Sequence, residues 1–268
     1  MVRSNLHTHS VFSDGENTIE QLADTAISKG FLTLGISDHS YTDFDDSFCM
    51  KSGVFDSYID KMRELKQKYE GRLELLTGME LDYYSENIDT QKLDYVIGSV
   101  HYVKNQAGEW FFVDHGAQLQ LYAIEKGFGN SKNAYIKAYY DNVCDHMQKN
   151  KPDIAGHFDV ITKFSLFDEE DPFYKKTALE SIDVVLDFGV VTEINTGAVA
   201  KGLRQKPYPN EYILRRIKER NGNVVINADA HVCENIDFYF DESAELLKSV
   251  GFKTALMLTK NGFTEYKL

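Results

Sequence analysis

The chain has 268 residues, of which 43% are apolar and 13% aromatic, enough to fill the core of one large domain or two small ones. Its formal charge of −13 disfavours a long polyanion as partner, because neutralising phosphates requires clustered Lys and Arg, so we expect a small substrate and no nucleic acid. The lack of an apolar run of membrane-spanning length, the lack of a signal segment, and only three cysteines without CxxC spacing predict a cytoplasmic protein with no membrane partner and no disulfide framework.

Short β-rich runs alternate with segments of helical spacing along the whole chain. The expected strands are residues 2–6, 31–37, 73–81, 94–100, 153–156, 189–195, 223–228 and 253–258. Alternation of this kind predicts βα units on a mainly parallel sheet. No Pro/Gly/Ser-rich linker interrupts the pattern, so we expect a single domain over residues 1–268.

Three of the segments between these strands carry helix signals. In the first, Asn17 and Glu20 have the spacing of a capping box, apolar residues follow at helical spacing, and Gly30 ends the helix. A second helix is expected before Gly71, with its apolar face formed by Tyr58, Ile59, Met62, Leu65 and Tyr69. A third is expected to start near Pro209.

The number of βα units favours a closed barrel over an open sheet. Seven or eight units in this length amount to roughly one per 35 residues, which suits a (β/α) barrel. The sequence contains neither a Gly-x-Gly-x-x-Gly motif nor a P-loop, which weakens a nucleotide-binding alternative. We therefore predict an α/β barrel.

Six of the eight histidines follow the carboxyl ends of expected strands: His7, His9, His39, His101, His157 and His231. Three acidic residues occupy similar places, namely Asp14, Glu80 and Asp229. In barrels of this kind, active sites are built at the carboxyl-terminal rim of the strands. His7 and His9 at the start of the chain are mirrored by Asp229 and His231 near its end, and closing a barrel brings its first and last strands together.

This set predicts a site with more than one metal ion, because a single catalytic zinc takes three or four protein ligands. Nitrogen and oxygen donors without thiolates favour Zn²⁺, Mn²⁺ or Fe²⁺. We place Asp38 beside the site, where it would orient an imidazole. His146, in a helical segment, is expected to be solvated, and His115, in a long connection, is not expected to touch substrate.

At these positions the sequence resembles the polymerase and histidinol phosphatase (PHP) superfamily, specifically its stand-alone histidinol-phosphate phosphatases. The motifs "NLHTHS", "SDG", "SDHS", "GMELD", "GSVH", "GHFD", "EINT" and "NADAH" occur in the family's order over nearly the whole chain. The resemblance implies a distorted, TIM-like (β/α)7 barrel with up to three metals at the rim. It also implies hydrolysis of L-histidinol phosphate to L-histidinol and phosphate in histidine biosynthesis.

The resemblance also implies three ligand sets. The first is His7, His9, Glu80 and Asp229; the second is Glu80, His101 and His157; the third is Asp14, His39 and His231. Two positions depart from the family pattern, because many relatives have Asp at position 5 and His at position 14. The affinity and identity of the third metal are therefore left open.

In a two-metal mechanism Glu80 is the expected bridge between the ions, which would activate water and polarise the phosphoryl group. The leaving alkoxide needs a proton, for which Asp229 is our candidate and His231 the alternative. For binding phosphate, Arg204 is the first choice, with Lys201 and Lys206 in the same basic segment after a strand. Asn195 is expected to share that pocket.

The organic half of histidinol phosphate carries an amine and an imidazole, which acidic and aromatic groups would suit. The segment "SYTDFDDSF" at residues 40–48 supplies both.

Three alternatives stay open at this point. The first is another small-molecule or nucleotide phosphoesterase on the same scaffold, and the second is a non-catalytic, metal-stabilised binding domain. The third is an amidohydrolase barrel, which shares the His-x-His opening but would call for a bridging lysine that has no placed candidate here. The sequence does not predict an oligomeric state.

Overall fold

The computed structural model describes residues 3–86 and 88–268. Within these residues the main sheet has nine strands in the order β1-β2-β3-β4-β7-β8-β9-β10-β11. Every neighbouring pair is parallel except β10 and β11. The strands are β1 (Ser4–Asn5), β2 (Thr33–Ile36), β3 (Glu74–Asp82), β4 (Tyr95–Ser99), β7 (Ile154–Ala155), β8 (Val191–Asn195), β9 (Val224–Asn227), β10 (Thr254–Thr259) and β11 (Gly262–Lys267). All eight predicted strands are present, although Val2, the first residue of the first one, lies outside the described residues.

The first and last of the seven strands β1 to β9 in this sheet meet at their carboxyl ends. Thr8 and Ala230 form a parallel bridge just beyond β1 and β9. In this bridge His9 N donates to Ala230 O at 2.8 Å and Ala230 N donates to His7 O at 3.2 Å. Strand β10 pairs with β9 through Leu256 and also contacts β1 and β2, so it lies next to the closing contact. The predicted α/β class is confirmed, and this closing contact is the one that a barrel requires.

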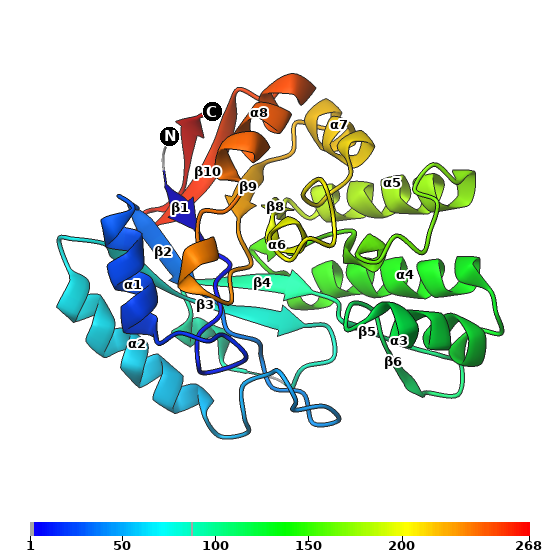
Figure 1. Cartoon of the computed structure of the whole chain (residues 1–268), viewed down its shortest axis with the longest axis horizontal. Helices are drawn as coiled ribbons and strands as arrows, with labels where there is room; N and C mark the ends of the chain where they lie inside the picture. Colours follow the sequence, from blue (N-terminus) through cyan, green and yellow to red (C-terminus); the bar gives the residue numbers. More distant parts are fainter. Residues whose placement is uncertain (1–2, 87) are drawn as a thin grey trace.

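Helices surround the curled sheet (Figure 1). They are α1 (Ile19–Ser28), α2 (Phe55–Tyr69), α4 (Lys132–Asn150), α5 (Pro172–Asp187), α7 (Glu211–Glu219) and α8 (Phe240–Val250), with the shorter α3 (Ala117–Tyr122) and α6 (Gly197–Ala200). The apolar faces of the helices and strands form one large core. A second, smaller core contains only strand and strand-end residues: Leu6, Leu76, Tyr95, Ile97, Ile154, Val191, Val225, Leu256 and Leu258. Side chains from the strands alone fill the interior of a barrel, and this second core has that composition.

Helix α2 buries all five apolar residues that predicted it. The start of α1 differs from the prediction, because Thr18 rather than Asn17 is the N-cap. Thr18 accepts a hydrogen bond from Gln21 N, and the Gln21 side chain accepts one from Thr18 N. Asn17 is unavailable because its side-chain oxygen accepts from Cys233 N at 2.8 Å. The capping box therefore lies one residue later.

His146 was expected to be solvated, and this prediction is wrong. Helix α4 packs with His146 on its buried face, next to Val143 and Met147. Its Nε2 lies 2.8 Å from Leu81 O and its Nδ1 lies 2.7 Å from Asn150 Nδ2. Both ring nitrogens are therefore satisfied inside the protein, and burial lowers the pKa of His146.

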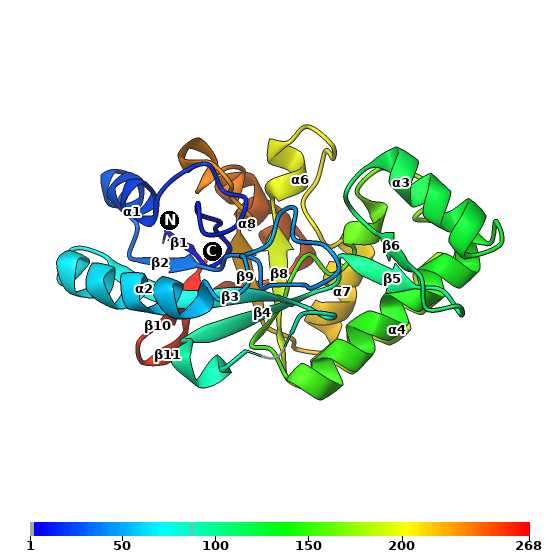
Figure 2. The ribbon, with the colours of Figure 1, turned by 90° about the horizontal axis from the view of Figure 1, so that it is seen from below.

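The hairpin of β5 (Tyr102–Lys104) and β6 (Trp110–Phe112) and the strand β11 were not among the predicted strands. Figure 2 shows the hairpin at the side of the molecule, near α3 and α4. Asn105 and Gly108 between two aromatic runs are a turn signal that could have revealed it. No helix in the described part of the chain combines the length and apolar character needed to cross a bilayer.

Tyr95 in the interior core depends on two glycines that leave space for its ring. A Cβ atom at Gly78 would lie 2.2 Å from Tyr95 Cζ, and one at Gly35 would lie 2.0 Å from the hydroxyl. We expect Gly78→Ala to lower the free energy of unfolding by about 1–3 kcal/mol, because the buried ring has to move. Urea denaturation of the chelator-treated protein measures this.

Gly116→Ala is the control, because nothing lies within 4 Å of the added atom and the backbone there is extended. Its free energy of unfolding should stay within about 0.5 kcal/mol of the parent. Equal stability of the Gly78→Ala and Gly116→Ala variants would contradict the packing described for Tyr95.

Candidate metal site

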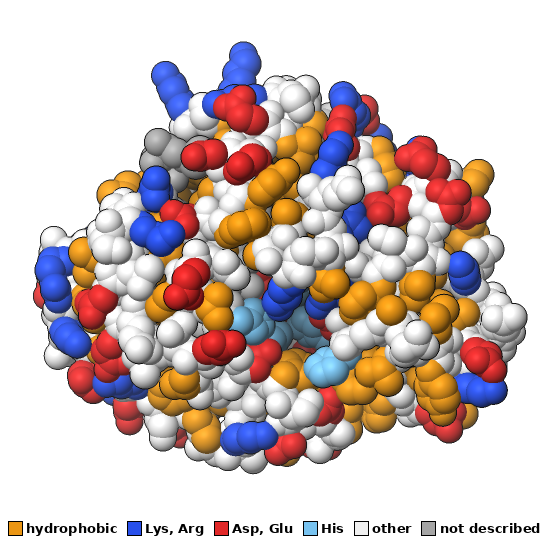
Figure 3. Space-filling model, viewed as in Figure 1, with side chains coloured by type: hydrophobic (Ala, Val, Ile, Leu, Met, Phe, Trp, Pro, Cys, Tyr) orange, Lys and Arg blue, Asp and Glu red, His pale blue; other side chains and the backbone are white. Residues whose placement is uncertain are grey.

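All nine predicted ligands gather at the carboxyl end of the strands. They come from the segments after β1, β2, β4, β7 and β9 and from β3 itself: His7, His9, Asp14, His39, Glu80, His101, His157, Asp229 and His231. Figure 3 shows a hollow on this face of the molecule with histidine side chains on its walls. The prediction that residues distant in the chain would converge at this rim agrees with these positions.

Glu80 is the centre of this cluster, because its two carboxylate oxygens face separate groups of imidazoles. Oε2 lies 3.1 Å from His7 Nε2 and 2.8 Å from His39 Nδ1. Oε1 lies 2.9 Å from His157 Nε2 and 3.4 Å from His101 Nε2. One carboxylate with a different set of nitrogens at each oxygen is the arrangement expected of a group that bridges two cations.

Asp229 lies on the β9 side of the cluster. Its Oδ1 is 3.2 Å from His9 Nε2 and 3.8 Å from His7 Nε2. The backbone of Asp229 has a φ of 49°, a left-handed conformation that non-glycine residues rarely adopt and that costs about 1–3 kcal/mol. Gly197 makes room for it, since a Cβ atom there would lie 3.0 Å from Asp229 Cβ. The loop after β9 therefore holds this carboxylate in place at an energetic cost.

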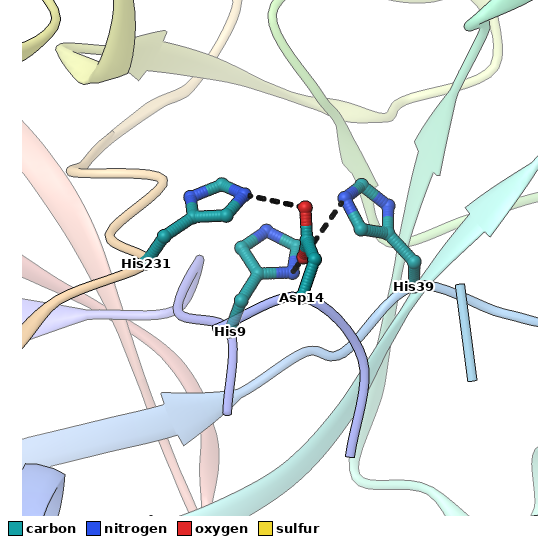
Figure 4. Close-up of side chains that lie close together, drawn as sticks. All are labelled: His9, Asp14, His39 and His231. Carbon is teal, nitrogen blue, oxygen red and sulfur yellow. Dashed lines mark ion pairs between the residues drawn. The ribbon is translucent and has the colours of Figure 1, made fainter. Parts of the chain in front are cut away.

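A third group surrounds Asp14. Its carboxylate lies between the rings of His231 and His39, with the ring of His9 beside it (Figure 4). Asp14 Oδ2 is 3.3 Å from His231 Nε2, and Asp14 Oδ1 is 3.7 Å from His39 Nε2 and 3.8 Å from His9 Nδ1. The structure thus adds His9 to the implied third set, and it also brings His39 close to Glu80.

The donor atoms of these side chains fit metal ions. Four groups have one nitrogen or oxygen from each member within 4.8 Å of the others. Several of the atoms are buried without a hydrogen-bond partner among the described residues, including His7 Nε2, both ring nitrogens of His9, and Glu80 Oε2. A buried polar atom left unpaired costs about 1–3 kcal/mol, and a cation between these atoms would supply the missing partner.

The electrostatics leave lone pairs on the carboxylates and on His9, whereas Glu193, Glu80 and Asp229 outweigh burial to raise the pKa of His7, which must release a proton to bind a metal. Burial alone would raise the pKa of Glu80 and Asp229, but neighbouring imidazoles, above all His7, hold both pKa values well below their usual range. Burial and the neighbouring His231 lower the pKa of His9 to about 3. Ionised carboxylates and a neutral imidazole are the protonation states that bind a divalent ion.

Residues that the sequence pattern did not single out hold the imidazoles in orientation. His101 Nδ1 lies 3.2 Å from Asp82 Oδ2, which also accepts a hydrogen bond from the His101 backbone at 2.8 Å. His7 Nδ1 lies 2.7 Å from Glu193 Oε1. Glu193 is recognisable in hindsight, because it is two residues before Asn195 on β8 and therefore shares its face.

Asp38 has a different role from the one predicted. Its carboxylate accepts hydrogen bonds from the backbone and the hydroxyl of Ser10 and from the hydroxyl of Ser13. It forms no hydrogen bond with an imidazole among the described residues. Asp38 therefore orders the loop between His9 and Asp14 instead of orienting a ring.

A cavity of about 210 Å³ opens over the cluster. Two cationic side chains line it, Lys163 after the short helix η3 (Val160–Thr162) and Lys201 after α6. Lys163 Nζ is 2.8 Å from Asp114 Oδ2, and Asp114 outweighs burial to raise the pKa of Lys163. His115 lines the cavity as well, so the long connection brings it to the candidate site.

The structure places Arg204 outside this cavity, which corrects its prediction as the phosphate ligand. Its guanidinium donates to Thr162 Oγ1 at 2.6 Å, pairs with Glu169 Oε1 at 3.1 Å, and stacks on the Tyr208 ring. These partners occupy the guanidinium away from the residues that line the cavity. Lys206 is exposed and pairs with Glu211, whereas Asn195 is buried at the site and donates to Asp229 Oδ2 at 3.3 Å.

This chain is similar in sequence to a known domain family and to several known proteins. A model of the PHP domain family matches residues 5–197. A protein of Deinococcus radiodurans named "Probable histidinol-phosphatase" is 30% identical over 260 residues, which cover 94% of this chain and 94% of the relative. The histidinol-phosphatase of Bacillus subtilis is 24% identical over 266 residues, or 89% of this chain and 97% of the relative.

Among solved structures, the histidinol phosphate phosphatase of Lactococcus lactis, in complex with Zn, L-histidinol and phosphate, has a TM-score of 0.74 with this chain. The two chains are 19% identical, and the match covers 98% of this chain and 100% of the other. At this identity the likeness concerns the fold.

Glu80→Gln tests the central role of this carboxylate in metal binding. We expect the variant to lose most of its metal, because the neutral amide cannot offset the charge of two cations and offers only one oxygen. Elemental analysis after zinc loading and gel filtration measures the content. His115→Gln is the matched control: it changes the same cavity but belongs to none of the donor groups, so its content should equal that of the parent. Full metal retention in Glu80→Gln would rule out a bridging Glu80.

Proposed function

Because the chain belongs to the PHP domain family, we propose that it is a metal-dependent phosphatase that hydrolyses L-histidinol phosphate to L-histidinol and phosphate. The observation that carries the proposal is the Glu80 carboxylate between two groups of imidazoles beneath a small cavity with two lysines. The names of the relatives support the substrate. The cavity volume of about 210 Å³ lies below the roughly 300–1,000 Å³ of clefts for drug-sized ligands, which favours a small phosphate ester over a nucleotide.

We propose that two to three Zn, Mn or Fe ions occupy the site. His7, His9, Glu80 and Asp229 would hold the first; Glu80, His101 and His157 the second; Asp14, His39 and His231, with His9 close by, the third. Ions held there would activate water as the nucleophile and neutralise charge on the phosphoryl group. The nitrogen and oxygen donor set supports these metals.

The proton for the leaving oxygen is assigned to Asp229. This residue lines the cavity, where its carboxylate is placed to take the proton that the attacking water loses and pass it to the alkoxide. His231 is the second candidate, because it lines the same cavity, and Asp14 and Asp229 outweigh burial to raise its pKa.

Lys163 and Lys201 replace Arg204 as the proposed phosphate ligands. Both line the cavity, and each ammonium can donate charge-assisted hydrogen bonds to phosphate oxygens. Asp114 keeps Lys163 charged and holds its side chain at the rim.

Phe48 and His115 are the proposed contacts for the organic half of the substrate. Phe48 is the one member of the 40–48 segment among the residues lining the cavity, and its ring centroid is 5.4 Å from that of His115. Asp43 and Asp46 are exposed, and Asp45 accepts a hydrogen bond from Tyr102 at 2.8 Å. An imidazole can stack on these rings, which supports the aromatic part of the predicted recognition segment.

The first test compares phosphate release from histidinol phosphate and from a nucleoside monophosphate by the zinc- or manganese-loaded protein. We expect kcat/KM to be at least about 100-fold higher for histidinol phosphate, because buried contacts made to one substrate are left unpaired by another. A higher value for the nucleotide would assign the site to a different phosphoesterase. No release from either substrate, with metal bound, would favour the non-catalytic binding domain.

The second test concerns the phosphate ligands. Lys163→Ala and Lys201→Ala should each lower kcat/KM by about 10- to 100-fold, because each removes a charge-assisted hydrogen bond of about 1.5–3 kcal/mol. Lys206→Ala, an exposed lysine of the same basic segment, should keep the parent value. If Lys206→Ala lowers kcat/KM as strongly as Lys201→Ala, general charge attraction and not the cavity binds phosphate.

A further inference from the structure

Glu193 on β8 is a buried carboxylate without any exposed surface, and four donors from different elements converge on it. Oε1 lies 2.7 Å from His7 Nδ1 and accepts from Asn227 Nδ2 at 2.9 Å. Oε2 accepts from the backbone N of His157 at 2.7 Å and from Asn195 Nδ2 at 2.9 Å. The four donors match the roughly four acceptor positions of an ionised carboxylate.

Two of these donors belong to candidate metal ligands of different sets. The bond to His7 places the hydrogen on Nδ1 and leaves Nε2 to face Glu80 Oε2 at 3.1 Å and Asp229 Oδ1 at 3.8 Å. The bond to the His157 backbone fixes the start of the loop whose imidazole lies 2.9 Å from Glu80 Oε1. Glu193 thus touches a ligand on each side of the Glu80 carboxylate without facing the cavity.

We propose that Glu193 is a positioning residue that aligns His7 and His157 toward the Glu80 carboxylate, where the proposed metal ions would bind. The inference rests on the metal site of the proposed function, although not on its substrate. A carboxylate partner on the far nitrogen of a metal-binding imidazole fixes its tautomer and raises its basicity, and loss of such a partner weakens metal binding by about 10- to 100-fold.

Glutamine cannot take the place of this carboxylate, although it has the same shape. If the glutamine oxygen faced His7, the glutamine NH₂ group would face the backbone N–H of His157. Both groups are donors, and the backbone N–H cannot act as an acceptor. With the opposite orientation, the NH₂ group would face His7 Nδ1 and favour the wrong tautomer. Either orientation disturbs one of the two ligands that Glu193 contacts.

The test is Glu193→Gln in the full chain, with zinc affinity measured by competition with a fluorescent chelator. We expect affinity to fall by about 10- to 100-fold. The visible spectrum of the Co²⁺-loaded protein should also change, since it responds to ligand geometry and not to overall stability. Neither readout needs histidinol phosphate, so failure of the proposed substrate leaves this test intact.

Asp159→Asn is the matched control. Asp159 is equally buried, follows the neighbouring β7, accepts from Asn210 N at 2.9 Å, and pairs with none of the nine candidate ligands among the described residues. It should keep the parent zinc affinity and Co²⁺ spectrum. Unchanged affinity and spectrum in Glu193→Gln, or the same losses in Asp159→Asn, would overturn the proposal.

Discussion

The contact between the ends of β1 and β9 is the constraint on which the candidate site depends. The Thr8–Ala230 bridge lies between His7 and His9 on one strand end and between Asp229 and His231 on the other. Two asparagines strengthen this contact, because Asn5 Oδ1 accepts from Ala228 N and Asn227 Oδ1 accepts from Leu6 N. Residues more than 220 positions apart in the chain thereby become neighbours within one cluster.

Gathering so many ionisable groups in a buried place requires a specific balance of charge. Burying a charge is costly unless it is paired and hydrogen-bonded, and here each buried carboxylate of the cluster faces imidazoles. Glu80 lies at the centre of the cluster and Glu193 behind it, with His7 between them. Cations at Glu80 would complete this balance, since several buried donor atoms there have no hydrogen-bond partner among the described residues.

Local patterns predicted the elements well and their polar details less well. The strands and the buried face of α2 follow from periodicity, which is a property of neighbouring residues. The cap of α1 was misplaced by one residue because a distant backbone group, Cys233 N, occupies Asn17. His146 was expected on the solvated side of α4, yet the packing of that helix on the sheet decides which side is buried. Such outcomes depend on partners that are far away in the sequence.

The sequence by itself determined which side chains reach the rim, because histidines and carboxylates at strand ends lie at one edge of any closed parallel barrel. Only the tertiary structure decided how they group, as with His39 beside Glu80 and His9 beside Asp14. It also decided that Lys163 faces the cavity while Arg204 binds Glu169 instead. The physical reason is that a long side chain follows its nearest partner of opposite charge, and that partner is set by how loops from different elements pack together.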